Sequence, residues 1–162
     1  METREFECLQ GLMDGFRNHL RLTTTDMDGI LMENLRAAIL VCEHEISTVI
    51  PVSSFTLGTE FSPAISLRYP VLQVTSVKVD GQVVPATEYS FDQKELRFAS
   101  DVEGSAVEVQ YSAGLPQIPF DIQAAIFLLG AGLFNNPTDH PEERDRTSAR
   151  NLLRPYRSWG KH

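Results

Sequence analysis

Hydrophobic positions divide the chain into two stretches of helical periodicity with a stretch of alternating residues between them. From about residue 20 to residue 50 apolar residues lie three or four positions apart, which predicts an amphipathic helix. Its apolar stripe comprises Leu31, Leu35, Ala38, Cys42, Ile46 and Val49. Thr23 to Asp28 supplies capping threonines and first-turn acids, and Pro51 is expected to end the helix. Residues 1–20 predict a short helical or irregular lead-in.

The period of the apolar residues changes to two in the middle of the chain, over about residues 59–112. Val77 and Val79 alternate with Lys78, and the following Asp80-Gly81 is a strong signal for a tight hairpin turn. The same alternation recurs at 89–91, 96–98 and 107–111, and residues 65–69 are expected to form a further strand. Because each strand has one apolar and one polar face, the pattern predicts an antiparallel sheet covered on one side.

Helical periodicity returns at Pro119, a residue that suits a first helical position. One apolar stripe holds Ile122, Ile126, Leu129 and Leu133, and a second holds Phe120, Ala124, Phe127, Ala131 and Phe134. A helix apolar nearly all round is covered on more than one side. It is either a central core helix or a helix with one face in a subunit contact. The candidates for that contact are Phe120, Ile122, Ile126, Phe127, Leu129 and Phe134.

The order of elements predicts an α+β fold in which an antiparallel sheet is inserted between a first long helix and the C-terminal helices. After Asn135-Asn136-Pro137, a last helix is expected from about Glu142 to Arg154. We expect one domain over residues 1–162, with 20–50 helical, 59–112 as the β insertion and 119–158 as C-terminal helices. A chain of 162 residues with 42% hydrophobic and 22% charged residues is long and apolar enough to bury a core.

Net charge is −8 and unevenly spread along the chain. Residues from 142 onward carry six basic and three acidic side chains, so residues 1–141 carry −11. Duplex DNA is gripped by cationic side chains that neutralise phosphates, so an acidic body is poorly suited to that task. It suits a surface to which DNA must not adhere, with a basic tail able to dock on an acidic partner.

The basic tail combines arginines with the only tryptophan. Arg146, Arg150, Arg154 and Arg157 recur at helical spacing, and Trp159 follows. Arginine and tryptophan are typical anchors of protein interfaces. The alternative is a solvated helix face balanced by Glu142, Glu143 and Asp145.

Residue types that carry chemistry form no catalytic constellation. Gly130-Ala131-Gly132 lies within an apolar helix, which favours close helix packing over a nucleotide fingerprint. Cys42 and His44 point to different sides of a helix and cannot share a metal, so His44 is interpreted as a surface histidine. Asp26 and Asp28 are explained by a solvated helix start. We therefore expect no enzyme, no metal and no cofactor.

Cysteine usage and the absence of targeting signals favour assembly in a reducing cytosol. Cys8 and Cys42 form no C-x-x-C pair, and Cys42 falls on the apolar stripe, where it is expected to be a core residue. Glu2, Glu5 and Glu7 argue against a signal peptide. The longest apolar run, residues 124–134, is too short to span a bilayer, so no membrane association is expected.

The order of four segments resembles the head–tail connector family of tailed bacteriophages. They are Leu20-Arg21-Leu22 with Thr25 to Asp28 and the long helix, Ile65 to Val71 leading into Val74 to Gly81, Val107 to Gly114 with Ile118-Pro119, and Leu152 to Arg157. Together they span about residues 20–158. Many members continue the apolar helix into a charged segment, whereas this chain has Asn135-Asn136-Pro137.

The resemblance implies a structural ring of about a dozen subunits beneath the portal, through which genome DNA passes without specific binding. It implies as partners the portal protein, a tail-completion or stopper protein and further copies of the chain. The location is the head–tail interface of the virion, after assembly in the host cytoplasm. The implied portal-docking residues are Arg150, Arg154, Tyr156, Arg157 and Trp159, and the channel-lining candidates are Asp26, Asp28, Glu33, Glu43 and Glu45.

Three other functions remain open from the sequence. A tail-completion or stopper protein would be richer in β-structure, so a helix content near half would favour the connector. A small cellular interaction module would form a discrete monomer or dimer without affinity for a portal. A hydrolase with dispersed residues would need a deep polar pocket.

Overall fold

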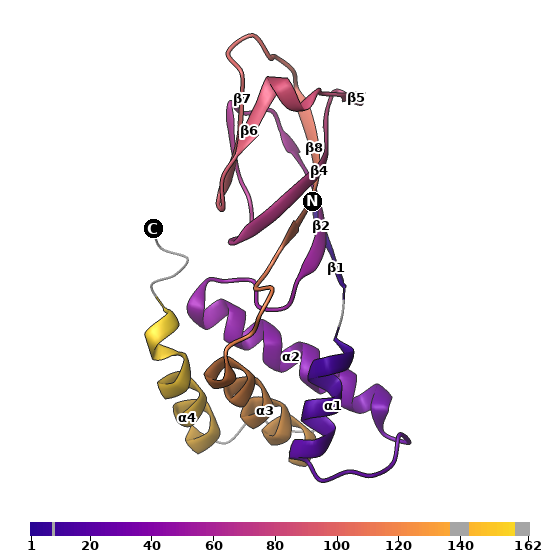
Figure 1. The fold of residues 1–162 in the computed structure, drawn as a ribbon, viewed down its shortest axis with the longest axis vertical. Coiled ribbons are helices and arrows are strands. Elements are labelled where there is room, and N and C mark those ends of the chain that lie inside the picture. The colour runs from indigo at the N-terminus through magenta and orange to yellow at the C-terminus, as the bar shows by residue number, and fades with distance from the viewer. Residues whose placement is uncertain (8, 137–142, 158–162) are drawn as a thin grey trace. The chain divides into compact units, whose positions relative to one another are not determined.

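The computed structural model describes residues 1–7, 9–136 and 143–157 and confirms the α+β class. The chain divides into two compact units. The β unit comprises Met1–Cys8 and Pro51–Pro116, and the helical unit comprises Leu9–Ile50 and Gln117–His162. The antiparallel strands are therefore inserted between two halves of a helical unit, as the order of periodicities predicts (Figure 1).

Four α-helices build the helical unit. They are α1 (Gln10–His19), α2 (Asp28–Ile46), α3 (Phe120–Asn135) and α4 (Glu143–Leu153), and a 3-10 turn, η2 (Arg154–Tyr156), extends α4 (Figure 1). α3 packs against each of the other three helices. Pro119 lies directly before α3 as its N-cap residue, one position ahead of the expected first helical position. The central place of α3 explains its two apolar faces within one subunit, because different neighbouring helices cover them.

Two close approaches join α1 to α3. The Phe16 ring lies against Gly130, where a Cβ atom would come within 2.8 Å of Phe16 Cζ. The Phe127 ring stacks on Phe16 with 5.8 Å between ring centroids. It also lies against Gly15 of α1, where a Cβ atom would come within 2.9 Å of Phe127 Cζ. Gly130 therefore serves helix packing, as expected from its place in an apolar helix.

α2 keeps the predicted apolar stripe but differs at both ends. Leu31, Leu35, Ala38, Cys42 and Ile46 are all fully buried. The threonine cap was wrongly predicted, because Met27 is the N-cap residue and makes no side-chain capping bond. The first-turn Asp28 instead pairs with Arg17 of α1 at 2.8 Å. The helix ends at Ile46, before Pro51, because Ser47 takes the left-handed conformation with φ of 54°.

Cys42 is a core residue, as expected from its position on the stripe. Its side chain is fully covered. Burial, reinforced by Glu43 and Glu45, raises the pKa of the Cys42 thiol to about 12, so the thiol stays protonated at neutral pH. It behaves as a small hydrophobic side chain.

The β unit contains two antiparallel sheets where one was predicted. The larger has the order β1 (Glu2–Phe6), β2 (Ser53–Glu60), β8 (Ala106–Ala113), β4 (Val71–Val79) and β5 (Gln82–Val83). The smaller has the order β3 (Ala64–Ser66), β7 (Glu95–Phe98) and β6 (Tyr89–Phe91), and the 3-10 turn η1 (Ala86–Glu88) precedes β6 (Figure 1). Alternation shows which face of a strand is apolar but not which strand lies beside it, so one sheet could not be told from two.

The helical or irregular lead-in expected over residues 1–20 is helical at α1, but the edge strand β1 corrects it at its start. Glu2–Phe6 pairs antiparallel with β2, in a register that places Arg4 opposite Phe55. The Arg4 guanidinium lies 4.1 Å from the centroid of the Phe6 ring. Five residues are too few to distinguish a period of two from a helical period, and pairing with a strand some fifty positions away decided the outcome. β2 likewise starts at Ser53, earlier than the expected residue 59.

The predicted hairpin at Asp80-Gly81 is confirmed. Both residues have positive φ, 49° and 82°, as the tight two-residue turn between β4 and β5 requires. The Asp80 carboxylate accepts hydrogen bonds from the backbone N–H groups of Ser105 and Ala106, the latter at 2.9 Å. The turn is thereby fixed to the residues that lead into β8.

Tyr111 connects several segments of the β unit. Its ring stacks on Phe55 with 5.2 Å between centroids. Its hydroxyl accepts a hydrogen bond from the Arg68 backbone N–H at 3.2 Å and donates one to the Glu2 carboxylate at 2.9 Å. Burial holds the pKa of Tyr111 well above its usual value, so this hydroxyl remains a donor throughout the neutral range.

We expect Gly114→Ala to destabilise the protein by about 2 kcal/mol or more. Gly114 has φ of 136°, and a Cβ atom there would lie 2.6 Å from the Pro51 carbonyl oxygen. Urea unfolding followed by circular dichroism gives the free energy of unfolding. The matched control is Gly29→Ala in α2, where a Cβ meets open space, and which should stabilise by about 0.5–1 kcal/mol. A Gly114→Ala variant as stable as the native protein would contradict the expectation.

Candidate interaction surface on the helical unit

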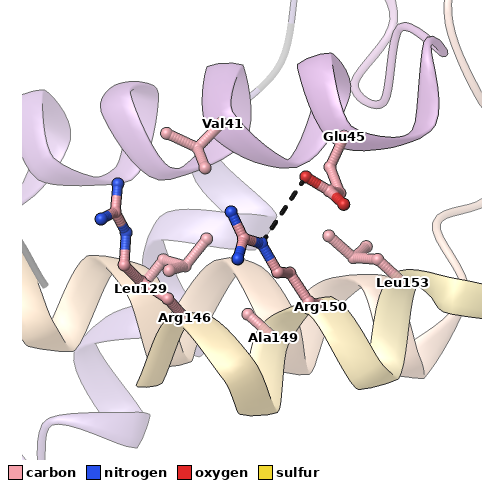
Figure 2. Close-up of a pocket in the computed structure, with 7 residues that line it drawn as sticks. All are labelled: Val41, Glu45, Leu129, Arg146, Ala149, Arg150 and Leu153. Atoms are coloured by element: carbon pink, nitrogen blue, oxygen red, sulfur yellow. Dashed lines mark ion pairs between the residues drawn. The ribbon is translucent and has the colours of Figure 1, made fainter. Parts of the chain in front are cut away.

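A shallow pocket lies where α4 packs against α2 and α3 (Figure 2). Its volume is about 50 Å³. The residues that line it are Val41 and Glu45 of α2, Leu129 of α3, and Arg146, Ala149, Arg150 and Leu153 of α4. Apolar side chains form its floor, and two arginines with one acid form its rim. Ala149 and Leu153 are each 1% exposed, so they also fix α4 in place.

Two acids of the helical unit, Glu45 of α2 and Asp121 of α3, hold the C-terminal segment. The Glu45 carboxylate pairs with Arg150 at 3.9 Å, the ion pair marked in Figure 2, and with the Arg157 guanidinium. The Tyr156 hydroxyl donates a hydrogen bond to the Asp121 carboxylate of α3 at 3.4 Å. Partial burial and the Asp121 charge both raise the pKa of Tyr156. Glu45 therefore neutralises part of the basic tail, and Asp121 holds Tyr156 through a hydrogen bond.

Three of the five portal-docking candidates make contacts inside the helical unit. Arg150 and Arg157 pair with Glu45, and Tyr156 bonds to Asp121. Arg154 is exposed. Trp159 lies outside the described residues. The sequence showed the arginine stripe, but Glu45, the acid that pairs with Arg150 and Arg157, lies more than a hundred positions away along the chain.

The channel-lining candidates have different environments. Asp26 and Glu33 are exposed and have no hydrogen-bond or ion-pair partner among the described residues. Asp28 pairs with Arg17, and Glu45 pairs with the arginines of the C-terminal segment. The Glu43 carboxylate accepts a hydrogen bond from the Ile50 backbone N–H at 2.8 Å. Asp26 and Glu33 are therefore the members of the set whose carboxylates are exposed and make no hydrogen bond or ion pair with a described residue.

The subunit-interface candidates divide into covered and exposed residues. Ile122 and Ile126 are fully buried and Leu129 is 3% exposed, so all three belong to the core of the subunit. Phe127 and Phe134 are half-buried, and Phe127 stacks against Phe16. Phe120 alone in this set lies largely in solvent, with 87% of its surface exposed. A contact with another subunit is therefore available chiefly to Phe120.

α2 exposes apolar residues that the sequence analysis did not select. Ile30, Leu40 and Val41 are each about half exposed, at 51%, 52% and 51%. All three lie off the buried stripe of α2, and this offset from the stripe is the signal that could have identified them. Large exposed apolar side chains gathered on one helix are a feature of contact surfaces.

Two pockets formed by described residues are small. The pocket beside α4 and a second one of about 130 Å³, lined by Ser90, Phe91, Asp92, Glu95 and Arg97, are far smaller than the roughly 300–1,000 Å³ of ligand sites. Within residues 1–7, 9–136 and 143–157, no three His, Cys, Asp or Glu side chains gather as a metal ion would require. His44 is exposed. None of the described helices is both long and apolar enough to cross a bilayer.

Elements and geometry together define an α+β protein with an antiparallel β unit inserted into a helical unit, which exposes apolar side chains on α2 and at the start of α3. Solved structures share this fold from end to end. A chain from the neck of an empty gene transfer agent (GTA) particle, computed with C6 symmetry, is similar with a TM-score of 0.73 and 22% identity, covering 97% of this chain and 95% of its own.

Two further chains from GTA particles show the same likeness. One, from the neck of the native particle computed with C12 symmetry, has a TM-score of 0.72 and 21% identity, covering 97% of this chain and 94% of its own. The other, from the virion of the native particle, has a TM-score of 0.71 and 23% identity, covering 96% and 95%. At these identities the likeness shows the fold. No family model and no curated protein matches the sequence.

We expect Glu45→Gln to loosen α4 without unfolding the protein. The variant removes the charge that pairs with Arg150 and Arg157, both partly exposed, so the free energy of unfolding should fall by at most about 1 kcal/mol. Amide hydrogen exchange in α4 should accelerate, most clearly at low salt. Glu33→Gln, at an exposed position of the same helix, is the matched control. Equal exchange rates in α4 for both variants at low salt would show that the ion pairs of Glu45 with Arg150 and Arg157 do not stabilise α4.

Proposed function

We propose that this chain is a non-enzymatic structural subunit of the head–tail neck of a tailed phage or phage-like particle. The observation that carries the proposal is the end-to-end match of its fold to chains of GTA particle necks, with 97% of this chain and 95% of the other covered. Because the match covers nearly the whole of both chains and not a single common motif, it supports the same kind of role for this chain as for the GTA neck chains.

The chain would act as a head–tail connector, forming a ring of about a dozen copies below the portal. The C6 and C12 symmetry of the GTA necks supports a cyclic arrangement of copies. A net charge of −8 supports passage of DNA without binding, because an acidic surface repels phosphates. No cofactor is needed for this role. The subunit would assemble in the host cytoplasm and function in the virion.

A tail-completion or stopper protein is the second candidate, and helix content favours it. Helices α1 to α4 contain 10, 19, 16 and 11 residues, 56 of the 150 described residues, which falls short of the half that would favour a connector. The stopper would belong to the same particle but would bind one step further from the capsid. The two candidates differ in which protein the chain binds directly.

Co-sedimentation with the portal protein of its own particle, followed by negative-stain electron microscopy, tests the proposal. A ring added to the exit face of the portal would establish the connector and give the number of subunits. Binding only to a portal that already carries another ring would establish the stopper. No binding to either, with all partners folded, would leave a cellular interaction module as the better hypothesis.

We expect the triple variant Arg154→Ala, Arg157→Ala, Trp159→Ala to lose portal binding while keeping its fold. Arginine and tryptophan anchors carry much of the binding energy of an interface. The matched control, Arg68→Ala, Arg97→Ala, Phe91→Ala, removes two exposed arginines and one exposed aromatic from the β unit. Circular dichroism checks the fold and co-sedimentation measures binding. Unchanged binding by the folded tail variant would exclude the tail as the docking element.

A further inference from the structure

Among the described residues of the helical unit, Phe120 is the most exposed large apolar residue. Its side chain is 87% exposed although it opens α3, whose next apolar residue, Ile122, is fully buried. Asp121 follows it directly and keeps a carboxylate at the surface. A phenyl ring left in water beside a carboxylate is a feature that a partner surface can cover.

The pocket beside α4 has the complementary chemistry. Val41, Leu129, Ala149 and Leu153 give it an apolar floor (Figure 2). On its rim, Arg146 makes no ion pair or hydrogen bond with a described residue, and the Arg150 side chain is 55% exposed although it pairs with Glu45. Arginine stacks on aromatic faces and binds carboxylates, so this rim suits a phenyl ring followed by an acid.

We propose that Phe120 of one copy packs against this pocket on the next copy of the chain, with Asp121 facing the arginines on the rim. The inference rests on the proposed ring, because a closed ring joins two different surfaces of the same protein at each contact. Phe120 with Asp121 is one surface, and the pocket between α2 and α4 is the other.

The size of the pocket defines how the contact is made. A volume of about 50 Å³ admits only an edge of the ring, so the rest of Phe120 lies on Val41 and on the aliphatic parts of the arginine side chains. Among the apolar residues of the pocket, Val41 contributes most of the free surface, since it is 51% exposed whereas Leu129, Ala149 and Leu153 are covered. Val41 is therefore the pocket residue whose change should affect the contact and not the fold.

The test places the photo-cross-linking residue p-benzoylphenylalanine at position 120. Full-length protein is prepared in isotopically labelled and unlabelled forms, which are mixed, so that cross-links between copies can be recognised by mass. Two samples are irradiated, the complex with the portal and the concentrated chain alone. We expect a cross-link between copies that joins position 120 to the α2 segment with Val41 or to the α4 segment with Ala149.

Val41→Glu and Leu40→Glu form a matched pair for this experiment. Both residues are about half exposed, at 51% and 52%, and they are adjacent on α2, but only Val41 lines the pocket. Val41→Glu should lower the yield of the cross-link about tenfold, the loss typical of a charge at the centre of a contact. Leu40→Glu should leave the yield unchanged.

Other outcomes overturn the inference. These are a cross-link to a different element, a cross-link to the portal, no cross-link between copies in either sample, or greater sensitivity to Leu40→Glu than to Val41→Glu. A ring on the portal with cross-links elsewhere would overturn this contact and leave the proposed function intact. The expected cross-link in the concentrated chain, without any ring on a portal, would keep the contact and exclude the connector.

Discussion

Close packing between α1 and α3 is the interaction on which the helical unit depends. Phe16 lies against Gly130 and Phe127 against Gly15, so each ring occupies the space that a Cβ atom would fill on the facing helix. This contact joins residues that are more than a hundred positions apart. Together with the more extensive packing of α3 on α2, it makes one unit of the chain before and after the β insertion. With α2 and α4 covering its other sides, α3 becomes a central helix. Its apolar surface is then used within the subunit, apart from Phe120 at its start.

Ion pairs within the helical unit limit which side chains of the basic tail are available to bind another protein. Glu45 binds Arg150 and Arg157, and Asp121 binds Tyr156, so these side chains already have partners before any other protein arrives. A partner that recruits them must offset the loss of those contacts, or must use Arg154, which is exposed. The sequence left open whether the tail docks on an acidic partner or is a solvated face balanced by Glu142, Glu143 and Asp145. In the folded unit, Arg150 and Arg157 pair with Glu45 of α2.

Several large apolar side chains of the described helical unit are not covered within the chain. Among the described residues of this unit, the most exposed large apolar side chains are Phe120, Leu40, Val41 and Ile30, on α2 and at the start of α3. The pockets beside α4 and near β6 are smaller than ligand sites of ordinary size. A subunit of a ring needs such patches in pairs, one complementary to another. Phe120 with its neighbouring acid and the arginine-rimmed pocket provide a pair of this kind.

Local pattern alone determined the α+β order of the chain, the apolar stripe of α2 with Cys42 in the core, and the hairpin at Asp80-Gly81. Each of these follows from residues within one element or one turn, where periodicity and backbone preference act directly. The tertiary structure decided which surfaces meet. It made Glu2–Phe6 a strand through pairing with β2, separated the strands into two sheets, covered most of the second face of α3 and joined Glu45 to Arg157. A pattern shows which face of an element is apolar or charged, but only packing between segments distant in sequence decides what covers that face.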